Sequence, residues 1–68
     1  MIMKEIGSII RMRRKELGIT QQELADICEV GINTLVAIER GQGNPSVRTL
    51  VKIASAVGYE LTLTRRHL

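Results

Sequence analysis

Residues 20–41 read TQQELADICEVGINTLVAIERG, and this stretch predicts two short helices joined by a tight turn. Thr20 and Glu23 have the spacing of a capping box, in which each side chain bonds the backbone amide of the other residue, so a helix should begin here. Gly31 is a suitable N-cap for a second helix. Gly41 can adopt the left-handed backbone that ends that helix.

Apolar spacing predicts which faces of these two helices are buried. On the first helix the inward positions are expected to be Leu24, Ile27 and Cys28, and on the second they are Leu35 and Ile38. Since the chain has one cysteine, no internal disulfide can form, and we expect that thiol to be a small core residue. A redox role is the alternative.

A further helix is predicted on each side of this stretch. The first spans Met3–Leu17 and is stopped by Gly18. The last is capped by Ser46 and stopped at Gly58. Its inward positions are Leu50, Ile53, Ala54 and Val57.

Composition limits the class of protein. Sixty-eight residues with one aromatic side chain make a single small domain with an aliphatic core. The net charge of +3 fits a polyanionic partner. No apolar run reaches the roughly 18–20 residues that span a membrane, so with a lone thiol we expect a cytoplasmic protein. No paired carboxylates, nucleophile–base set or metal-ligand cluster can be assembled, and we therefore expect no enzymatic activity, metal or cofactor.

The chain ends in a different pattern. Tyr59, Leu61 and Leu63 alternate with polar residues, which predicts a strand. Because a lone strand leaves its backbone groups unpaired, the simplest expectation is antiparallel pairing with the same strand of a second copy. A frayed tail and a strand packed on its own helices are the alternatives. We thus expect a helical domain over 1–58 and a dimerisation strand with a basic tail over 59–68.

Two short helices joined by a turn of three or four residues form a helix-turn-helix, whose second helix can enter the major groove of DNA. Residues 17–58, LGITQQELADICEVGINTLVAIERGQGNPSVRTLVKIASAVG, resemble the helix-turn-helix domains of phage-repressor and Xre type. The resemblance lies in the Thr-Gln-x-Glu-Leu-Ala start, the Ile-Glu-Arg-Gly helix end, the Asn-Pro-Ser loop and the Leu-x-x-x-Ala-x-x-x-Gly helix. Residues 59–66, YELTLTRR, resemble the C-terminal strand through which HipB-type antitoxins dimerise. This implies an all-α, lambda-repressor-like DNA-binding domain of four to five helices, with a C-terminal β-strand that pairs across a dimer.

The resemblance also implies roles for individual residues. Base-facing positions are Gln21, Ile32, Asn33, Thr34, Val36 and Ala37. Positions near backbone phosphate are Thr20, Gln22, Arg40, Gln42, Asn44 and Ser46, with Arg48 as an addition. Gln21 matches a residue that contacts phosphate and sometimes a base. Arg14 and Glu39 would form a structural ion pair, and a DNA contact is the alternative for Arg14.

The predicted recognition helix is poor in charge. Asn33 can pair bidentately with adenine, and Ile32, Val36 and Ala37 could pack on thymine methyls, with core packing as the alternative for these three. No Arg, Lys or Gln occupies its base-facing positions, so DNA shape is expected to supply part of the specificity. Glu29 stands where the family often has glycine in the turn, and we expect some backbone strain there.

The expected function is a sequence-specific, double-stranded DNA-binding regulator that acts as a dimeric repressor on a short inverted repeat. Half-sites would lie about 34–36 Å apart. A toxin encoded nearby is the natural candidate for a protein partner, in which case the chain would be an antitoxin that represses its own operon. The alternative is a small protein-interaction module with residual DNA binding, using the exposed apolar strip of the recognition helix as a docking face.

Overall fold

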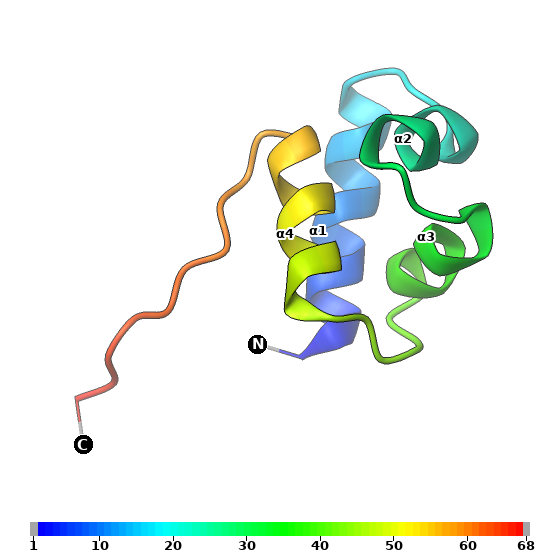
Figure 1. Cartoon of the computed structure of the whole chain (residues 1–68). Helices are drawn as coiled ribbons and strands as arrows, with labels where there is room; N and C mark the ends of the chain where they lie inside the picture. The colour runs from blue at the N-terminus through cyan, green and yellow to red at the C-terminus, as the bar shows by residue number, and fades with distance from the viewer. Residues whose placement is uncertain (1, 68) are drawn as a thin grey trace.

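Four helices form the body of the molecule in residues 2–67, the part of the chain that the computed structural model describes (Figure 1). They are α1 (Met3–Glu16), α2 (Gln21–Cys28), α3 (Ile32–Glu39) and α4 (Val47–Ala56). Helix α3 packs against both α1 and α2, and α2 also packs against α4. Within these residues, no helix is long and apolar enough to cross a lipid bilayer.

Local chemistry at the helix ends follows the expectations from sequence. The Thr20 hydroxyl accepts a bond from the Glu23 amide at 3.0 Å, and the Glu23 carboxylate accepts one from the Thr20 amide at 2.9 Å. This reciprocal capping box begins α2. Ser46 caps α4 by accepting from the Thr49 amide at 3.1 Å. Gly41 follows α3 with φ +74°, the left-handed conformation expected at a helix end.

The core is aliphatic and joins all four helices. Its most deeply buried side chains are Leu24, Leu35, Ile38, Ile53 and Val57. Cys28 is buried as predicted, with its sulfur 3.9 Å from the Lys52 carbonyl oxygen. Burial raises the pKa of this thiol, so it stays protonated and packs as a small apolar group. Leu50 is half-buried at the edge of this core.

The expectation that Ile27 faces inward is wrong, because its side chain is 61% exposed. A helix turns about 100° per residue, so Ala25 and Cys28 lie on one side of Leu24 and Ile27 lies on the other. The buried arc of α2 runs from Leu24 through Cys28 to Ala25. The apolar spacing alone did not reveal on which side of Leu24 the neighbouring helices would pack.

Helices α1 and α3 approach each other so closely that their backbones touch. Gly7 is buried in α1, and a Cβ atom at this position would overlap the carbonyl oxygen of Ile38. It would also lie 3.2 Å from the carbonyl carbon of Glu39. Glycine is therefore required here for lack of space, and the last turn of α3 rests directly on α1.

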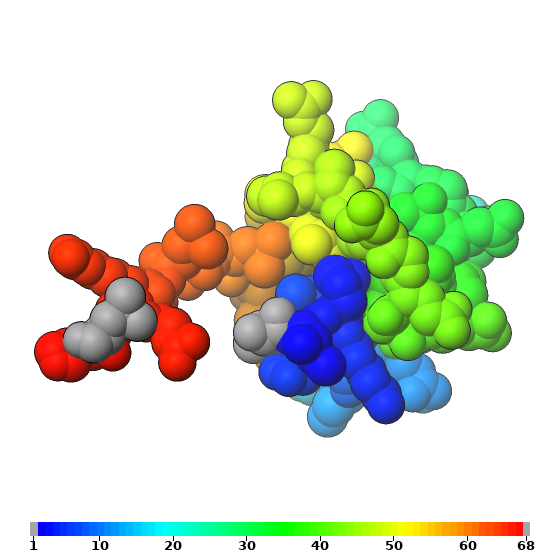
Figure 2. Space-filling model, turned by 90° about the horizontal axis from the view of Figure 1, so that it is seen from below, coloured from blue at the N-terminus to red at the C-terminus, as the bar shows by residue number. Residues whose placement is uncertain are grey.

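Residues 59–67 extend away from the helices without regular secondary structure (Figure 1). Figure 2 shows this segment, coloured orange to red, projecting from the body. The strand expected at Tyr59, Leu61 and Leu63 is not formed in the single chain, because within the described residues it has no neighbouring strand to supply ladder hydrogen bonds. The side chain of Leu63 is fully exposed. Pairing with a second copy stays a prediction. The division into 1–58 and 59–68 also stays a prediction, and its outer ends, Met1 and Leu68, lie outside the described residues.

Candidate nucleic-acid interface

The turn between α2 and α3 has the geometry of a helix-turn-helix. Glu29 adopts a left-handed backbone, with φ 56° and ψ 42°, as expected from its place in the turn. A non-glycine residue in this region costs about 1–2 kcal/mol. The Glu29 amide donates to the Asp26 carbonyl at 3.2 Å, and the Val30 amide donates to the Ala25 carbonyl at 3.0 Å. These bonds end α2 and direct the chain into α3 through the N-cap Gly31.

Helix α3 presents a polar side to solvent. Leu35 and Ile38 are buried, whereas Asn33 and Thr34 are exposed. Val36 and Ala37 are half-buried, and around the helix Ala37 lies between Asn33 and Thr34 on the same outward side. The exposed position of Asn33, near the start of the helix, is where a recognition helix carries its base-reading side chains.

Ile32 was expected to face the bases, but it is half-buried and packs against the core. It precedes Leu35 by three residues, and side chains with that spacing are neighbours on one helix face. The core-packing alternative thus applies to Ile32, and a base contact would be limited to its exposed edge. With one member turned inward, the apolar strip of α3 offers less area to a docking protein than the sequence predicted.

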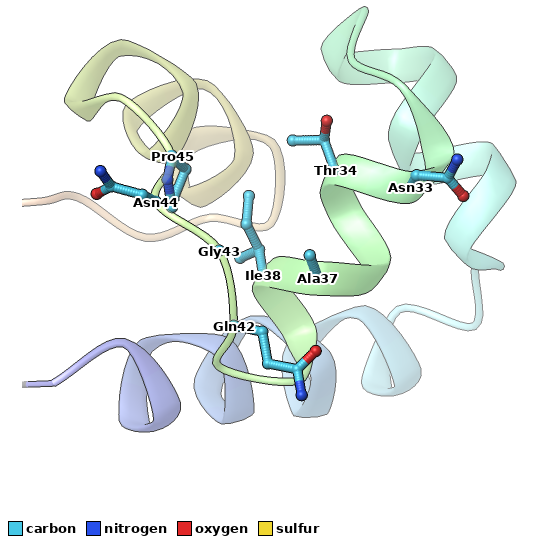
Figure 3. A pocket seen from close by; sticks show the side chains of 8 residues that line it. All are labelled: Asn33, Thr34, Ala37, Ile38, Gln42, Gly43, Asn44 and Pro45. Carbon is cyan, nitrogen blue, oxygen red and sulfur yellow. The ribbon is translucent and has the colours of Figure 1, made fainter.

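A shallow groove of about 390 Å³ lies between α3 and the loop that follows it (Figure 3). It is lined by Asn33, Thr34, Ala37, Ile38, Gln42, Gly43, Asn44 and Pro45. Asn33 lies toward one end of the groove and Gln42 toward the other. The structure thereby brings together three residues expected to face bases and two expected near phosphate.

Gly43 and Pro45 line this groove and were missed by reasoning from sequence. Gly43 has φ +80°, and a Cβ atom there would stand 3.6 Å from the Ala37 side chain. The loop therefore passes close to α3 and forms the second wall of the groove. The signal for it was the Gly-Asn-Pro run, which predicts a turn but not the helix face that the turn will border.

The start of α2 offers unpaired backbone donors. The capping box uses the Thr20 and Glu23 amides, while the backbone amides of Gln21 and Gln22 have no partner among the described residues. Such free amides and the positive end of the helix dipole attract anions. The side chain of Gln22 is turned along the helix, donating to Asp26 Oδ1 at 2.9 Å.

A buried ion pair joins α1 to α3, as the family resemblance implied. Arg14 Nε donates to Glu39 Oε2 at 2.7 Å, and its Nη2 donates to Glu39 Oε1 at 2.9 Å. The hydrogen bond to Glu39 raises the pKa of Arg14 above its ordinary value, although burial opposes it. Arg14 Nη1 also donates to the Ile19 carbonyl at 2.9 Å, just before α2 begins. Because Arg14 is buried, the guanidinium is not free to meet a phosphate.

Gln21 belongs to the same cluster, which the sequence did not predict. Its Nε2 donates to Glu39 Oε1 at 3.1 Å, so the carboxylate is shared between Gln21 and Arg14. The two residues are eighteen positions apart, and no local pattern links them.

The remaining residues expected near phosphate differ in their freedom. Arg40, Gln42 and Asn44 are exposed at the end of α3 and in the loop. Ser46 is exposed but does not line the groove, and its hydroxyl is engaged with Thr49, donating to Oγ1 at 3.0 Å while accepting from the amide. Arg48 is exposed on the first turn of α4.

Comparison with known proteins finds a match to the helix-turn-helix family HTH_3 over residues 10–63. A relative from Methanothermobacter thermautotrophicus, named an uncharacterized HTH-type transcriptional regulator, is 45% identical over 53 residues, covering 78% of this chain and 77% of the relative. The immunity repressor protein of Bacillus phage phi105 is 37% identical over 57 residues, or 84% of this chain and 40% of the repressor.

A solved structure shows the same arrangement of helices. The clp gene regulator ClgR from Corynebacterium glutamicum superposes with a TM-score of 0.80 at 28% sequence identity, over 88% of this chain and 64% of that one. The chain thus spans about two fifths of the phage repressor and under two thirds of ClgR. What is shared is the helical body that carries the groove.

Proposed function

The chain belongs to the helix-turn-helix family of transcriptional regulators, and on that premise we propose that it is a sequence-specific repressor that binds an inverted repeat in double-stranded DNA as a dimer. The observation that carries this proposal is the groove beside α3. It gathers the exposed Asn33 and Thr34 of the recognition helix with Gln42 and Asn44 of the following loop. Polar side chains from both segments are thereby available to one stretch of DNA.

Base recognition is assigned mainly to Asn33. Its carboxamide can donate to adenine N7 and accept from adenine N6 in the major groove. The half-buried Val36 and Ala37 supply methyl groups for contact with thymine. Since α3 carries no basic side chain, part of the specificity is assigned to the shape and deformability of the DNA.

Backbone contacts are assigned to the segments that flank α3. The free amides of Gln21 and Gln22 at the start of α2 suit a phosphate oxygen. On the far side, Arg40 supplies a cation, and Gln42 and Asn44 supply amides. Such contacts set the register of the protein on DNA without reading sequence.

Dimerisation is assigned to the C-terminal segment. Tyr59, Leu61 and Leu63 are all exposed in the single chain, although they alternate as the residues of a half-buried strand do. Pairing this segment with its copy would supply the missing ladder hydrogen bonds and bring these side chains against those of the copy. Binding to an inverted repeat then requires the two recognition helices to lie about 34–36 Å apart. On the resemblance of residues 59–66 to the C-terminal strand of HipB-type antitoxins, we extend the proposal to a toxin as protein partner and to action in the cytoplasm.

Selection of bound sites from random duplex DNA, using the purified chain, tests the proposal. The expected result is an inverted repeat with half-sites about one helical turn apart. Affinity for the selected site should fall steeply as salt rises, because cations are released from the phosphates that the protein contacts. Failure to enrich any sequence, or an affinity that is insensitive to salt, would contradict the proposal.

A further inference from the structure

We infer that Glu39 is a positioning residue for DNA binding, which holds the Gln21 carboxamide at the head of α2 in the orientation that meets the DNA backbone. The inference rests on the proposed DNA-binding function. It assigns a recognition role to a buried residue that would not itself touch DNA. Glu39 would act through Gln21 alone.

The first support is the geometry of the shared carboxylate. The Glu39 side chain is 2% exposed, and its Oε1 accepts from Arg14 Nη2 at 2.9 Å and from Gln21 Nε2 at 3.1 Å. Gln21 is half-buried. A primary amide has two N–H donors and one carbonyl oxygen. With one donor turned inward to Glu39, the second donor and the oxygen are left for a ligand at the start of α2.

The second support is the charge balance of the cluster. An isolated carboxylate beside a phosphate-binding amide would repel the DNA. Here Arg14 makes two hydrogen bonds to the same carboxylate, so its positive charge offsets the negative charge of Glu39. Glu39 can therefore hold the amide of Gln21 without adding net negative charge to the site.

The third support is that Arg14 also places the helix to which Gln21 belongs. Its Nη1 donates to the Ile19 carbonyl at 2.9 Å, two residues before Gln21. One buried guanidinium therefore ties the end of α3 to the entry of α2. The same ion pair therefore fixes both parts of Gln21: Glu39 bonds its side chain, and Arg14 bonds the backbone that leads into its helix.

A glutamine held in place before binding loses less side-chain freedom when it meets its ligand. For one such side chain the saving is expected to be about 3- to 10-fold in affinity. A glutamine without the bond to Glu39 would make the same contact with DNA, but the affinity would be about 3- to 10-fold lower.

The test is a double-mutant cycle on DNA affinity. Arg14→Met and Glu39→Met are introduced together, since replacing a buried ion pair by apolar residues of similar size preserves folding better than breaking it. Gln21→Ala is then measured in the native chain and in this background. We expect Gln21→Ala to weaken binding about 3- to 10-fold more in the native chain than in the apolar background. Equal losses in the two backgrounds would mean that the ion pair is structural only, and would overturn the inference.

Gln22→Ala is the matched control. This neighbouring glutamine bonds Asp26 rather than Glu39, so its effect on affinity should be the same in both backgrounds. A background-dependent effect at Gln22 as well would show a general distortion of α2 and would also overturn the inference.

A second measurement needs no DNA. In the native chain, the two Nε2 protons of Gln21 should give well-separated, slowly exchanging NMR signals because one of them is bonded to Glu39. These signals should collapse toward those of a free glutamine in the apolar background. Free-glutamine signals in the native chain would overturn the inference while leaving the proposed function intact. Failure of the native chain to bind any DNA would overturn the proposed function, and the inference with it, even where the NMR signature is present.

Discussion

Asn33 is the residue on which the proposed base recognition depends most. It is exposed near the start of α3 and lines the groove. Asn33→Ala should weaken operator binding by about 1–3 kcal/mol and relax the base preference at one position in each half-site. Affinity measurements and a repeated site selection with the variant check both effects.

Ser55→Ala is a suitable control for this prediction. Ser55 is exposed on α4 and does not line the groove, so its loss should change neither affinity nor base preference. A variant at Asn33 that selects the same sites as the native chain would show that another residue reads the base.

Arg14 represents the opposite case, a charged residue whose role is internal. Arg14→Met leaves Glu39 buried without its partner, and breaking one side of a buried pair costs about 3–5 kcal/mol. We therefore expect Arg14→Met to lose more free energy of unfolding than free energy of DNA binding. The affinity is measured at a temperature where the variant is still folded. Thermal unfolding and DNA titration of the same variant provide the comparison.

Arg11→Met controls for the loss of a cation from α1, because Arg11 is exposed. It should leave the melting temperature nearly unchanged. If Arg14→Met instead reduced affinity more than stability, Arg14 would be a phosphate contact.

At the scale of elements, the α2–α3 turn stores strain that glycine would relieve. Glu29 is held at φ 56°, which costs a non-glycine residue about 1–2 kcal/mol, although glycine loses part of this advantage through its freedom in the unfolded chain. Glu29→Gly should therefore raise stability by roughly 0.5 kcal/mol, as measured by chemical denaturation.

Glu29→Ala separates backbone strain from charge. It removes the carboxylate but keeps the Cβ atom, so no comparable gain in stability is expected. An equal gain from alanine would attribute the effect to charge and not to the turn.

The capping box of α2 should make stability depend on pH. Hydrogen bonds from the Thr20 amide and hydroxyl to the carboxylate lower the pKa of Glu23 below its ordinary value. A lowered folded-state pKa contributes stability that is present above the unfolded pKa, about 4.3, and is lost as pH falls through the folded value. The melting temperature should therefore decline as the pH falls from the unfolded pKa of glutamate through the lower folded pKa of Glu23.

Glu23→Gln isolates this contribution, because glutamine can still complete a capping box but does not titrate. Its melting temperature should decline less steeply over the same acidic range. Parallel curves for the two proteins would show that other carboxylates carry the pH dependence.

Elements could be predicted where local chemistry decides them. The Thr20 cap and the left-handed Gly41 depend on residues within a few positions of each other, and both were predicted from local sequence. The turn at Glu29 was predicted from the resemblance to the family. The facing of Ile27 and Ile32 depends on where other helices pack, which spacing alone leaves open. The bond between Gln21 and Glu39 joins residues eighteen apart through the tertiary fold, so no pattern in the sequence pointed to it.

At the scale of the whole molecule, the proposed dimerisation by residues after Gly58 can be tested apart from the folding of the helices. Removing residues after Gly58 should give folded monomers, because Leu35, Ile53 and the rest of the buried core lie before that position. Operator affinity should fall sharply, since a monomer contacts only one half-site. Sedimentation and DNA titration of the truncated chain measure both effects.

A shorter truncation, after Thr64, removes only the basic tail and should preserve dimers. Dimers that persist after truncation at Gly58 would show that the helices themselves dimerise, and the proposed strand pairing would then be wrong.

The contact between Gly7 and the last turn of α3 affects whether the protein or the DNA changes shape when the two bind. Where two helices are separated by flexible side chains, one can slide or tilt as those side chains repack. Here main chain rests on main chain, so α3 has little room to shift against α1. We therefore expect α3 to keep its position on α1 in the complex, and a mismatch in groove width or twist to be met by deformation of the DNA.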